Sequence, residues 1–211
     1  YMITELRRQN LLDQGLWSYL NKFDIQYDPS EYCYQPVKKF QQDKSYVEQY
    51  EYHLKHGNSI EEKHLDVDAS KDAWHNRGMT AQHYADTYFN IVTETWPADP
   101  SFFVTEKIFK PIVNLQPFAV CGLPGNLKYL KDKGYETFPE WFVEDYDRVD
   151  GHKQRMYYLT EQIKRIANLS LDELHKKYQE TWEKCLYNRK HFFANDHTGD
   201  FRVLVKEITK L

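Results

Sequence analysis

The feature that most constrains the fold is an alternation of apolar and polar segments between residues 89 and 122. An apolar run over residues 89–92 leads to Glu94, and a polar loop follows it. Residues 105–107 (Thr-Glu-Lys) then open a short amphipathic segment, and a second apolar run over residues 117–121 ends at Gly122. This order of strand, loop, helix and strand is the unit that builds a parallel sheet, in which ligands bind at the carboxyl ends of the strands. We therefore expect an α/β fold with a Rossmann-like parallel sheet.

The next segments continue this pattern. Asn126 is expected to cap a helix over residues 127–133 that Gly134 ends, and residues 135–138 are expected to add a third parallel strand. Beyond residue 150, apolar residues recur at intervals of three and four, which predicts long C-terminal helices packed on the sheet. They include Met156, Leu159, Ile163, Ile166, Leu171, Leu174, Tyr178, Trp182, Cys185 and, at the end, Phe201, Leu204, Val205, Ile208 and Leu211.

Residues 89–96, 103–111 and 116–122 together resemble the donor-sugar motif of glycosyltransferases of the two-Rossmann (GT-B) type. The nearest pattern is the fucosyltransferase-like one, in which an acidic strand end precedes Thr-Glu-Lys. The resemblance covers about residues 85–165, and the stretches 134–138 and 141–147 are similar to viral and environmental glycosyltransferase-like proteins. It implies the donor-binding, C-terminal half of a GT-B enzyme. That half would bind a nucleotide-diphosphate sugar, with GDP as the suggested nucleotide, for inverting transfer of a hexose or fucose to an unknown acceptor without metal or cofactor.

A nucleotide-sugar site needs a carboxylate for the ribose hydroxyls, and a cation with backbone N–H groups for the diphosphate. By resemblance, Glu106 holds the ribose, Lys107 meets the diphosphate and Thr105 caps the helix. Glu94 matches the earlier acid of the family, which lies near the donor sugar or orients the loop, and it is the one candidate here for a catalytic role. Lys110, one turn after Lys107, is a second candidate for a phosphate contact.

The resemblance leaves gaps. Fucosyltransferases carry a further basic residue on an earlier segment, for which Arg7 and Arg8 are the candidates, and their catalytic base belongs to an acceptor domain that this sequence does not reveal. Thr-Glu-Lys is also common at ordinary helix starts. The alternatives are a non-catalytic α/β interaction or assembly module that retains the glycosyltransferase fold, and another enzyme that binds nucleotides at the same strand ends.

The 211 residues accommodate one compact domain with appended helices. We expect an N-terminal helical and irregular segment over residues 1–84, truncated at its start, with a helix over residues 2–14 that Gly15 ends in a left-handed conformation. A donor-binding core follows over residues 85–150, and C-terminal helices follow over residues 151–211. An upstream acceptor domain would complete the enzyme.

The composition restricts the classes of molecule that this chain is expected to bind. The net charge is −4, with 28 basic and 32 acidic residues, which gives no overall attraction to nucleic acid. No run approaches the roughly 20 apolar residues that a membrane helix needs, so we expect no membrane span and a cytoplasmic location. The three cysteines, Cys33, Cys121 and Cys185, are widely spaced, as in a protein with reduced thiols. The acidic run from Glu144 to Asp150 lacks the spacing of a calcium loop, and no metal site is expected.

Overall fold

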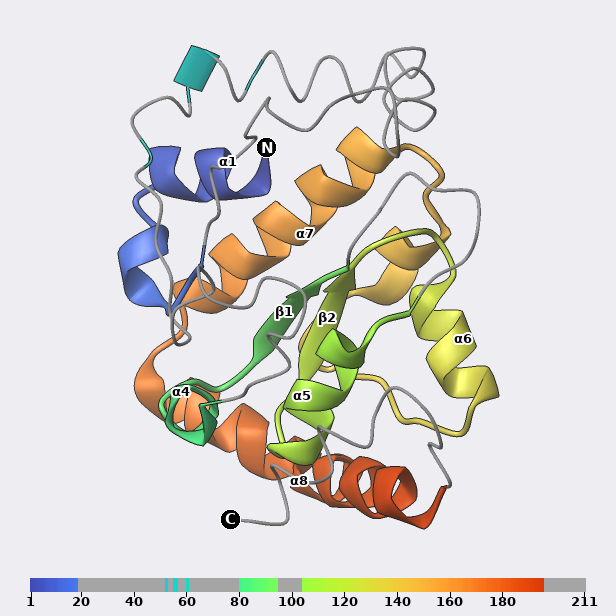
Figure 1. Ribbon diagram of the computed structural model, residues 1–211. Coiled ribbons are helices and arrows are strands. Elements are labelled where there is room, and N and C mark those ends of the chain that lie inside the picture. The colour runs from blue at the N-terminus through green and yellow to red at the C-terminus, as the bar shows by residue number, and fades with distance from the viewer. Residues whose placement is uncertain (19–51, 53–54, 57–59, 61–79, 95–103, 196–211) are drawn as a thin grey trace, which may run out of the picture.

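The computed structural model describes residues 1–18, 52, 55–56, 60, 80–94 and 104–195. Two parallel strands, β1 (Asn90–Thr93) and β2 (Phe118–Cys121), lie side by side at the centre of the molecule (Figure 1). All four residues of β2 are buried, as expected for a parallel strand covered on both faces. The predicted pairing of these two segments in parallel is therefore confirmed.

The connection between the strands is helical, as the sequence predicts. A 3₁₀ turn, η2 (Glu106–Ile108), leads directly into α5 (Phe109–Val113), which returns the chain to the start of β2. Pro111 is accommodated because it lies in the first turn of α5, where a backbone N–H has no partner within the helix. Four of the five residues of α5 are buried in the core beside the sheet.

The predicted third strand is wrong. Residues 135–138 form an irregular loop, and the sheet has two strands within the described residues. The outer edge of β2 is covered differently, because the backbone N–H of Val120 donates to the phenol oxygen of Tyr146 at 3.0 Å. A side chain thus occupies a position where a third strand would pair. The structure is mixed α/β with a small parallel sheet, and the described residues do not form a full Rossmann-like sheet.

The helix after β2 ends as the sequence predicts. Helix α6 (Asn126–Asp132) is followed by Gly134 at φ 86°, a left-handed conformation that glycine adopts without strain. The backbone N–H of Gly134 donates to the carbonyl of Lys131 at 2.9 Å, and that of Tyr135 to the carbonyl of Leu130 at 2.9 Å. These two bonds form a Schellman motif, which satisfies carbonyl groups at the end of the helix.

Two long helices follow the short 3₁₀ segment η3 (Glu144–Arg148): α7 (His152–Ala167) and α8 (Leu171–Ala194). Ser170 and Glu173 form the reciprocal capping box that opens α8. Helix α8 packs at the amino ends of the strands, since the Tyr178 hydroxyl donates to the carbonyl of Leu115, just before β2 (Figure 1). The predicted C-terminal helices are confirmed as far as residue 194, and the apolar pattern over residues 201–211 lies outside the described residues.

The N-terminal segment differs from the expected continuous helix. It forms α1 (Met2–Arg8) and the 3₁₀ turn η1 (Leu12–Gln14), separated at Asn10, which has a positive φ of 58°. Gly15 is extended, with φ −149°, so the predicted left-handed glycine cap is wrong. Helix α1 lies against α7, and the short helix α4 (Ala81–Ala85) precedes β1 (Figure 1). Among the described residues, no helix is long and apolar enough to cross a membrane.

Candidate functional site

Glu94 lies at the carboxyl end of β1 and joins it to the start of the connecting helix. Its backbone N–H extends the sheet by donating to the carbonyl of Cys121 at 3.0 Å. Its carboxylate, 4% exposed, accepts hydrogen bonds from the Thr105 backbone N–H at 3.2 Å and from Thr105 Oγ1 at 2.5 Å. Both carboxylate oxygens therefore face Thr105, which fixes the chain entering η2 beside the strand end.

Thr105 caps η2, as the sequence predicts. Its extended backbone, φ −99° and ψ 176°, precedes the turn, and Oγ1 accepts from the backbone N–H of Lys107 at 3.3 Å. The Lys107 ammonium lies 3.4 Å from the same oxygen. Because the Thr105 hydroxyl donates its proton to Glu94, its oxygen is oriented to accept from Lys107. Glu94, Thr105 and Lys107 thus form one chain of hydrogen bonds from the buried strand end to a half-exposed cation.

Glu106 and Lys107 are both accessible at the end of this chain. Their side chains are 28% and 39% exposed, and Lys107 Nζ lies 3.8 Å from Glu106 Oε1. A pair with this exposure contributes little to stability. What the pair does present to a ligand is a carboxylate beside an ammonium group, which suits a molecule carrying both hydroxyl and phosphate groups.

Lys110 is placed in α5, one helical turn beyond Lys107, and is half-buried. Its carbonyl group accepts a hydrogen bond from the Asn114 side chain at 2.7 Å. The hydrogen bonds that unite Glu94, Thr105 and Lys107 thus join three of the five predicted site residues. Glu106 lies beside Lys107, and Lys110 lies one helical turn further along the chain, in α5.

The start of α6 differs from the expectation. Gly125, with φ 88°, occupies the capping position and Asn126 is the first helical residue, so the predicted Asn126 cap is wrong. The carboxylate of Asp147 instead accepts from the backbone N–H groups of Leu127 and Lys128, both at 3.1 Å. In the sequence, Asp147 stands out only as part of the acidic run from Glu144 to Asp150. Because this carboxylate already binds the first turn of α6, these N–H groups are not available to a phosphate.

Asn126 and Gly122 are two further residues at this edge that sequence reasoning did not assign to a site. The Asn126 side chain is 1% exposed, and its Nδ2 donates to the carbonyl of Leu123 at 2.9 Å. A Cβ atom on Gly122 would lie 2.3 Å from Asn126 Nδ2 and 3.3 Å from Glu94 Cβ. The side chains of Asn126 and Glu94 therefore approach the same point above Gly122, at the carboxyl ends of β1 and β2.

The other candidates from the sequence have structural roles. Arg8 donates to both oxygens of Glu5, through Nε at 3.0 Å and Nη2 at 2.5 Å, and so is bound within α1. Burial raises the pKa of Cys121 to about 11, which keeps this thiol protonated and a weak nucleophile at neutral pH. Glu144 pairs with Lys131 at 2.6 Å, which explains part of the acidic run. No group of three His, Cys, Asp or Glu residues in the described ranges could hold a metal ion.

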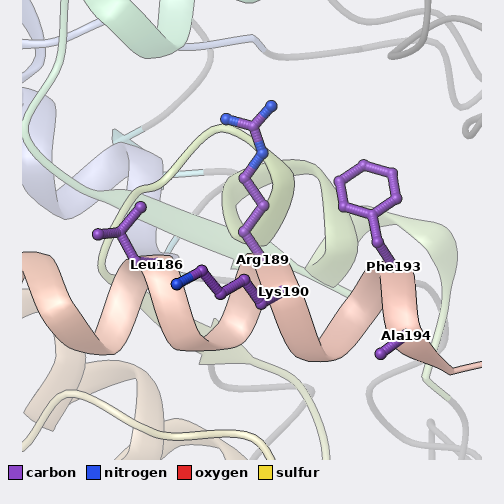
Figure 2. Close-up of a pocket in the computed structure, with 5 residues that line it drawn as sticks. All are labelled: Leu186, Arg189, Lys190, Phe193 and Ala194. Atoms are coloured by element: carbon purple, nitrogen blue, oxygen red, sulfur yellow. The ribbon is translucent and has the colours of Figure 1, made fainter.

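A shallow pocket lies elsewhere, on the outer surface of α8 (Figure 2). Its lining combines apolar and basic side chains: Leu186, Arg189, Lys190, Phe193 and Ala194. All five come from one helix, and none belongs to the predicted site. Helix α8 contacts the residue before β2 through Tyr178, whereas Glu94 follows the carboxyl end of β1.

No family model, curated protein or solved structure matches this chain.

Proposed function

We propose that this chain is the donor-binding half of a glycosyltransferase that binds a nucleotide-diphosphate sugar, with GDP as the first candidate nucleotide. The observation that carries the proposal is the chain of hydrogen bonds from Glu94 through Thr105 to Lys107. It lies at the carboxyl end of a parallel strand pair, which is where open α/β sheets bind ligands. The resemblance to the fucosyltransferase-like motif supports the same residues independently of this geometry.

The residues have distinct roles in this proposal. The Lys107 ammonium meets the diphosphate, and the Glu106 carboxylate accepts from the ribose hydroxyls. Glu94 is a positioning residue, because both of its oxygens accept from Thr105. Of the roles expected for Glu94, we therefore favour orientation of the loop over a contact with the donor sugar or a catalytic role. Lys110 is a secondary phosphate contact from the next turn of the helix.

The chemistry that follows is transfer with inversion at the sugar carbon. Such a reaction needs positioning of donor and acceptor and stabilisation of the negative charge that develops on the diphosphate leaving group. The Lys107 ammonium supplies that charge stabilisation, and its contact with Thr105 Oγ1 at 3.4 Å holds it beside the strand end. The acceptor-binding residues and the catalytic base would come from an acceptor domain, as in two-domain enzymes of this kind.

The test begins with a thermal-shift screen against GDP, UDP, ADP, GDP-fucose and pyrophosphate, followed by titration calorimetry. Lys107→Ala should weaken binding of the best nucleoside diphosphate by ten- to a hundredfold, because a charge-assisted contact is worth about 1.5–3 kcal/mol. Lys164→Ala is a matched control. Lys164 is 48% exposed and lies 4.0 Å from Glu161, much as Lys107 lies beside Glu106, and it is in α7. Its loss should leave affinity unchanged.

Glu106→Gln separates the two contacts. It should weaken binding of the nucleoside diphosphate more than that of pyrophosphate, which has no ribose, whereas Lys107→Ala should weaken both. Equal affinity of the wild type and Lys107→Ala would end the donor-site proposal. Absence of binding to every nucleotide in the screen would favour the alternative, a non-catalytic α/β interaction module.

A further inference from the structure

The carboxyl edge of the sheet contains a buried acceptor that the hydrogen bonds of the fold do not use. Asn126 is 1% exposed, and its Oδ1 atom is buried without a hydrogen-bond partner among the described residues. A buried polar atom in this state costs about 1–3 kcal/mol, so native proteins keep few of them, and those they keep often have a functional explanation. This one lies beside the proposed donor site.

The orientation of the amide is fixed by its neighbour. Asn126 Nδ2 donates to the carbonyl oxygen of Leu123, which can only accept. Exchange of the amide oxygen and nitrogen would place two acceptors against each other, so the nitrogen belongs at this position and the oxygen remains unused. The unsatisfied group is therefore an acceptor that requires a donor.

Its surroundings restrict what that donor can be. An ionised phosphate oxygen can only accept a hydrogen bond, so it cannot satisfy the amide oxygen of Asn126. The backbone N–H groups of Leu127 and Lys128 already bind Asp147, so these two groups at the start of α6 are not available to an anion. An uncharged hydroxyl group fits, because it can donate to the amide oxygen without carrying charge into a buried site.

We propose that Asn126 Oδ1 accepts a hydrogen bond from a hydroxyl group of the bound sugar nucleotide. This assignment rests on the proposed function and adds a residue that selects for a hydroxylated ligand, separate from the diphosphate contact at Lys107. Gly122 is part of the arrangement, because any Cβ there would lie 2.3 Å from Asn126 Nδ2 and displace the amide. The hydroxyl belongs either to the ribose or to the transferred sugar.

The experiment compares three ligands by titration calorimetry: GDP, 2′,3′-dideoxy-GDP and GDP-fucose. If the wild type binds UDP rather than GDP, the uridine counterparts with UDP-glucose replace them. Asn126→Ala should weaken the hydroxyl-bearing ligand about tenfold, the loss of one hydrogen bond. A ribose contact predicts that GDP and GDP-fucose both weaken while the dideoxy compound does not. A contact to the transferred sugar predicts that GDP-fucose alone weakens.

Asn188→Ala is the matched control. Asn188 is also 1% exposed, but its Oδ1 accepts from the Glu136 N–H at 2.8 Å and its Nδ2 donates to the Glu136 carbonyl at 2.8 Å, so it is satisfied within the fold. Its replacement should lower the melting temperature and leave all three affinities unchanged. If Asn126→Ala does not fold, Asn126→Ser makes the same comparison, since serine is too short to reach the position of Oδ1.

Three results are decisive against the inference. Unchanged affinity of the Asn126 variant for all three ligands would mean that an ordered water, and not the ligand, donates to Asn126 Oδ1. Equal weakening of all three, the dideoxy compound included, would indicate a general distortion of the site. In both cases binding by the wild type that depends on Lys107 would leave the proposed function intact. Failure of the wild type to bind any nucleoside diphosphate would refute both the proposed function and this inference.

Discussion

At the scale of single residues, the Thr105 cap was predicted correctly, whereas the distant partner of the first turn of α6 was not. The Thr105 cap depends on residues two positions apart, so the sequence contains the whole interaction. The cap of α6 comes from Asp147, 20 residues after Leu127, and Asn126 was taken for it because asparagine is common at that position. No pattern near Asn126 indicates that a distant carboxylate takes this role.

Asp147 provides a prediction at this scale. Asp147→Ala removes the acceptor for two backbone N–H groups and should lower the free energy of unfolding by about 1–2 kcal/mol, the usual effect of losing a helix cap. Chemical denaturation monitored by circular dichroism measures the change. Asp145→Ala is the control, since Asp145 is exposed in the same segment. Equal denaturation midpoints for the two variants would refute the assignment of Asp147 as the cap.

In the candidate site, too, contacts between residues close in sequence are predicted and contacts between distant residues are not. The sequence places Glu94, Thr105 and Lys107 at a strand end and a helix start, and the structure joins them by hydrogen bonds. The sequence does not predict that Gly122 and Asn126 lie beside Glu94, because this approach exists only once the two strands are paired. Whether these residues bind a sugar nucleotide stays a prediction.

At the scale of secondary structure elements, α8 shows where hydrophobic periodicity fails. The pattern indicates Trp182 as a core residue, but Trp182 is exposed, and the buried positions are Thr181, Cys185, Asn188 and Phe192. Because Thr181 and Asn188 are polar, a hydrophobic pattern does not predict that they are buried. They are buried because Thr181 Oγ1 accepts from Trp141 Nε1 at 3.1 Å and Asn188 binds the backbone of Glu136.

The neighbouring phenylalanines of α8 test which face is buried. Phe192 is 1% exposed and its ring centroid lies 5.2 Å from that of Phe109 in α5, whereas Phe193 is 44% exposed. Phe192→Ala should lower the free energy of unfolding by about 3–5 kcal/mol, and Phe193→Ala by less than about 1 kcal/mol. Trp182→Ala should resemble Phe193→Ala. Urea denaturation of the three variants measures this, and a larger loss for Phe193 than for Phe192 would reverse the assignment of the two faces.

At the scale of the whole molecule, a two-stranded sheet is too small to be stable alone, so the helices hold it together. The α/β class and the parallel pair followed from the order of apolar and capped segments. The missing third strand did not, because residues 135–138 contain apolar side chains that a loop can bury as well as a strand. Tyr135 and Phe138 are both buried, and Phe138 packs edge-on against Phe118 of β2 at 5.1 Å between ring centroids.

The attachment of the first helix to this core should depend on pH through Glu5. Hydrogen bonds from Arg8, and further ones from Tyr52 and Gln9, hold the pKa of Glu5 at about 2, against an ordinary value of 4.5. A carboxyl group with a lowered pKa in the folded state stabilises the protein fully above pH 4.5, and this contribution is lost as the pH falls towards 2. Helix α1 carries Glu5 and packs against α7, so loss of these hydrogen bonds should weaken the packing of α1 on α7.

Glu5→Gln should therefore lower the melting temperature at pH 7 by about 5 °C, because hydrogen bonds to a charged group are lost. The difference from wild type should stay constant down to about pH 4.5 and shrink by pH 3, where the unfolded wild type has gained the proton. Calorimetric melting between pH 7 and pH 3 measures both. Glu183→Gln, at an exposed position of α8, should show no such dependence. A difference that grows as the pH falls would mean that the ionised Glu5 does not stabilise the attachment of α1.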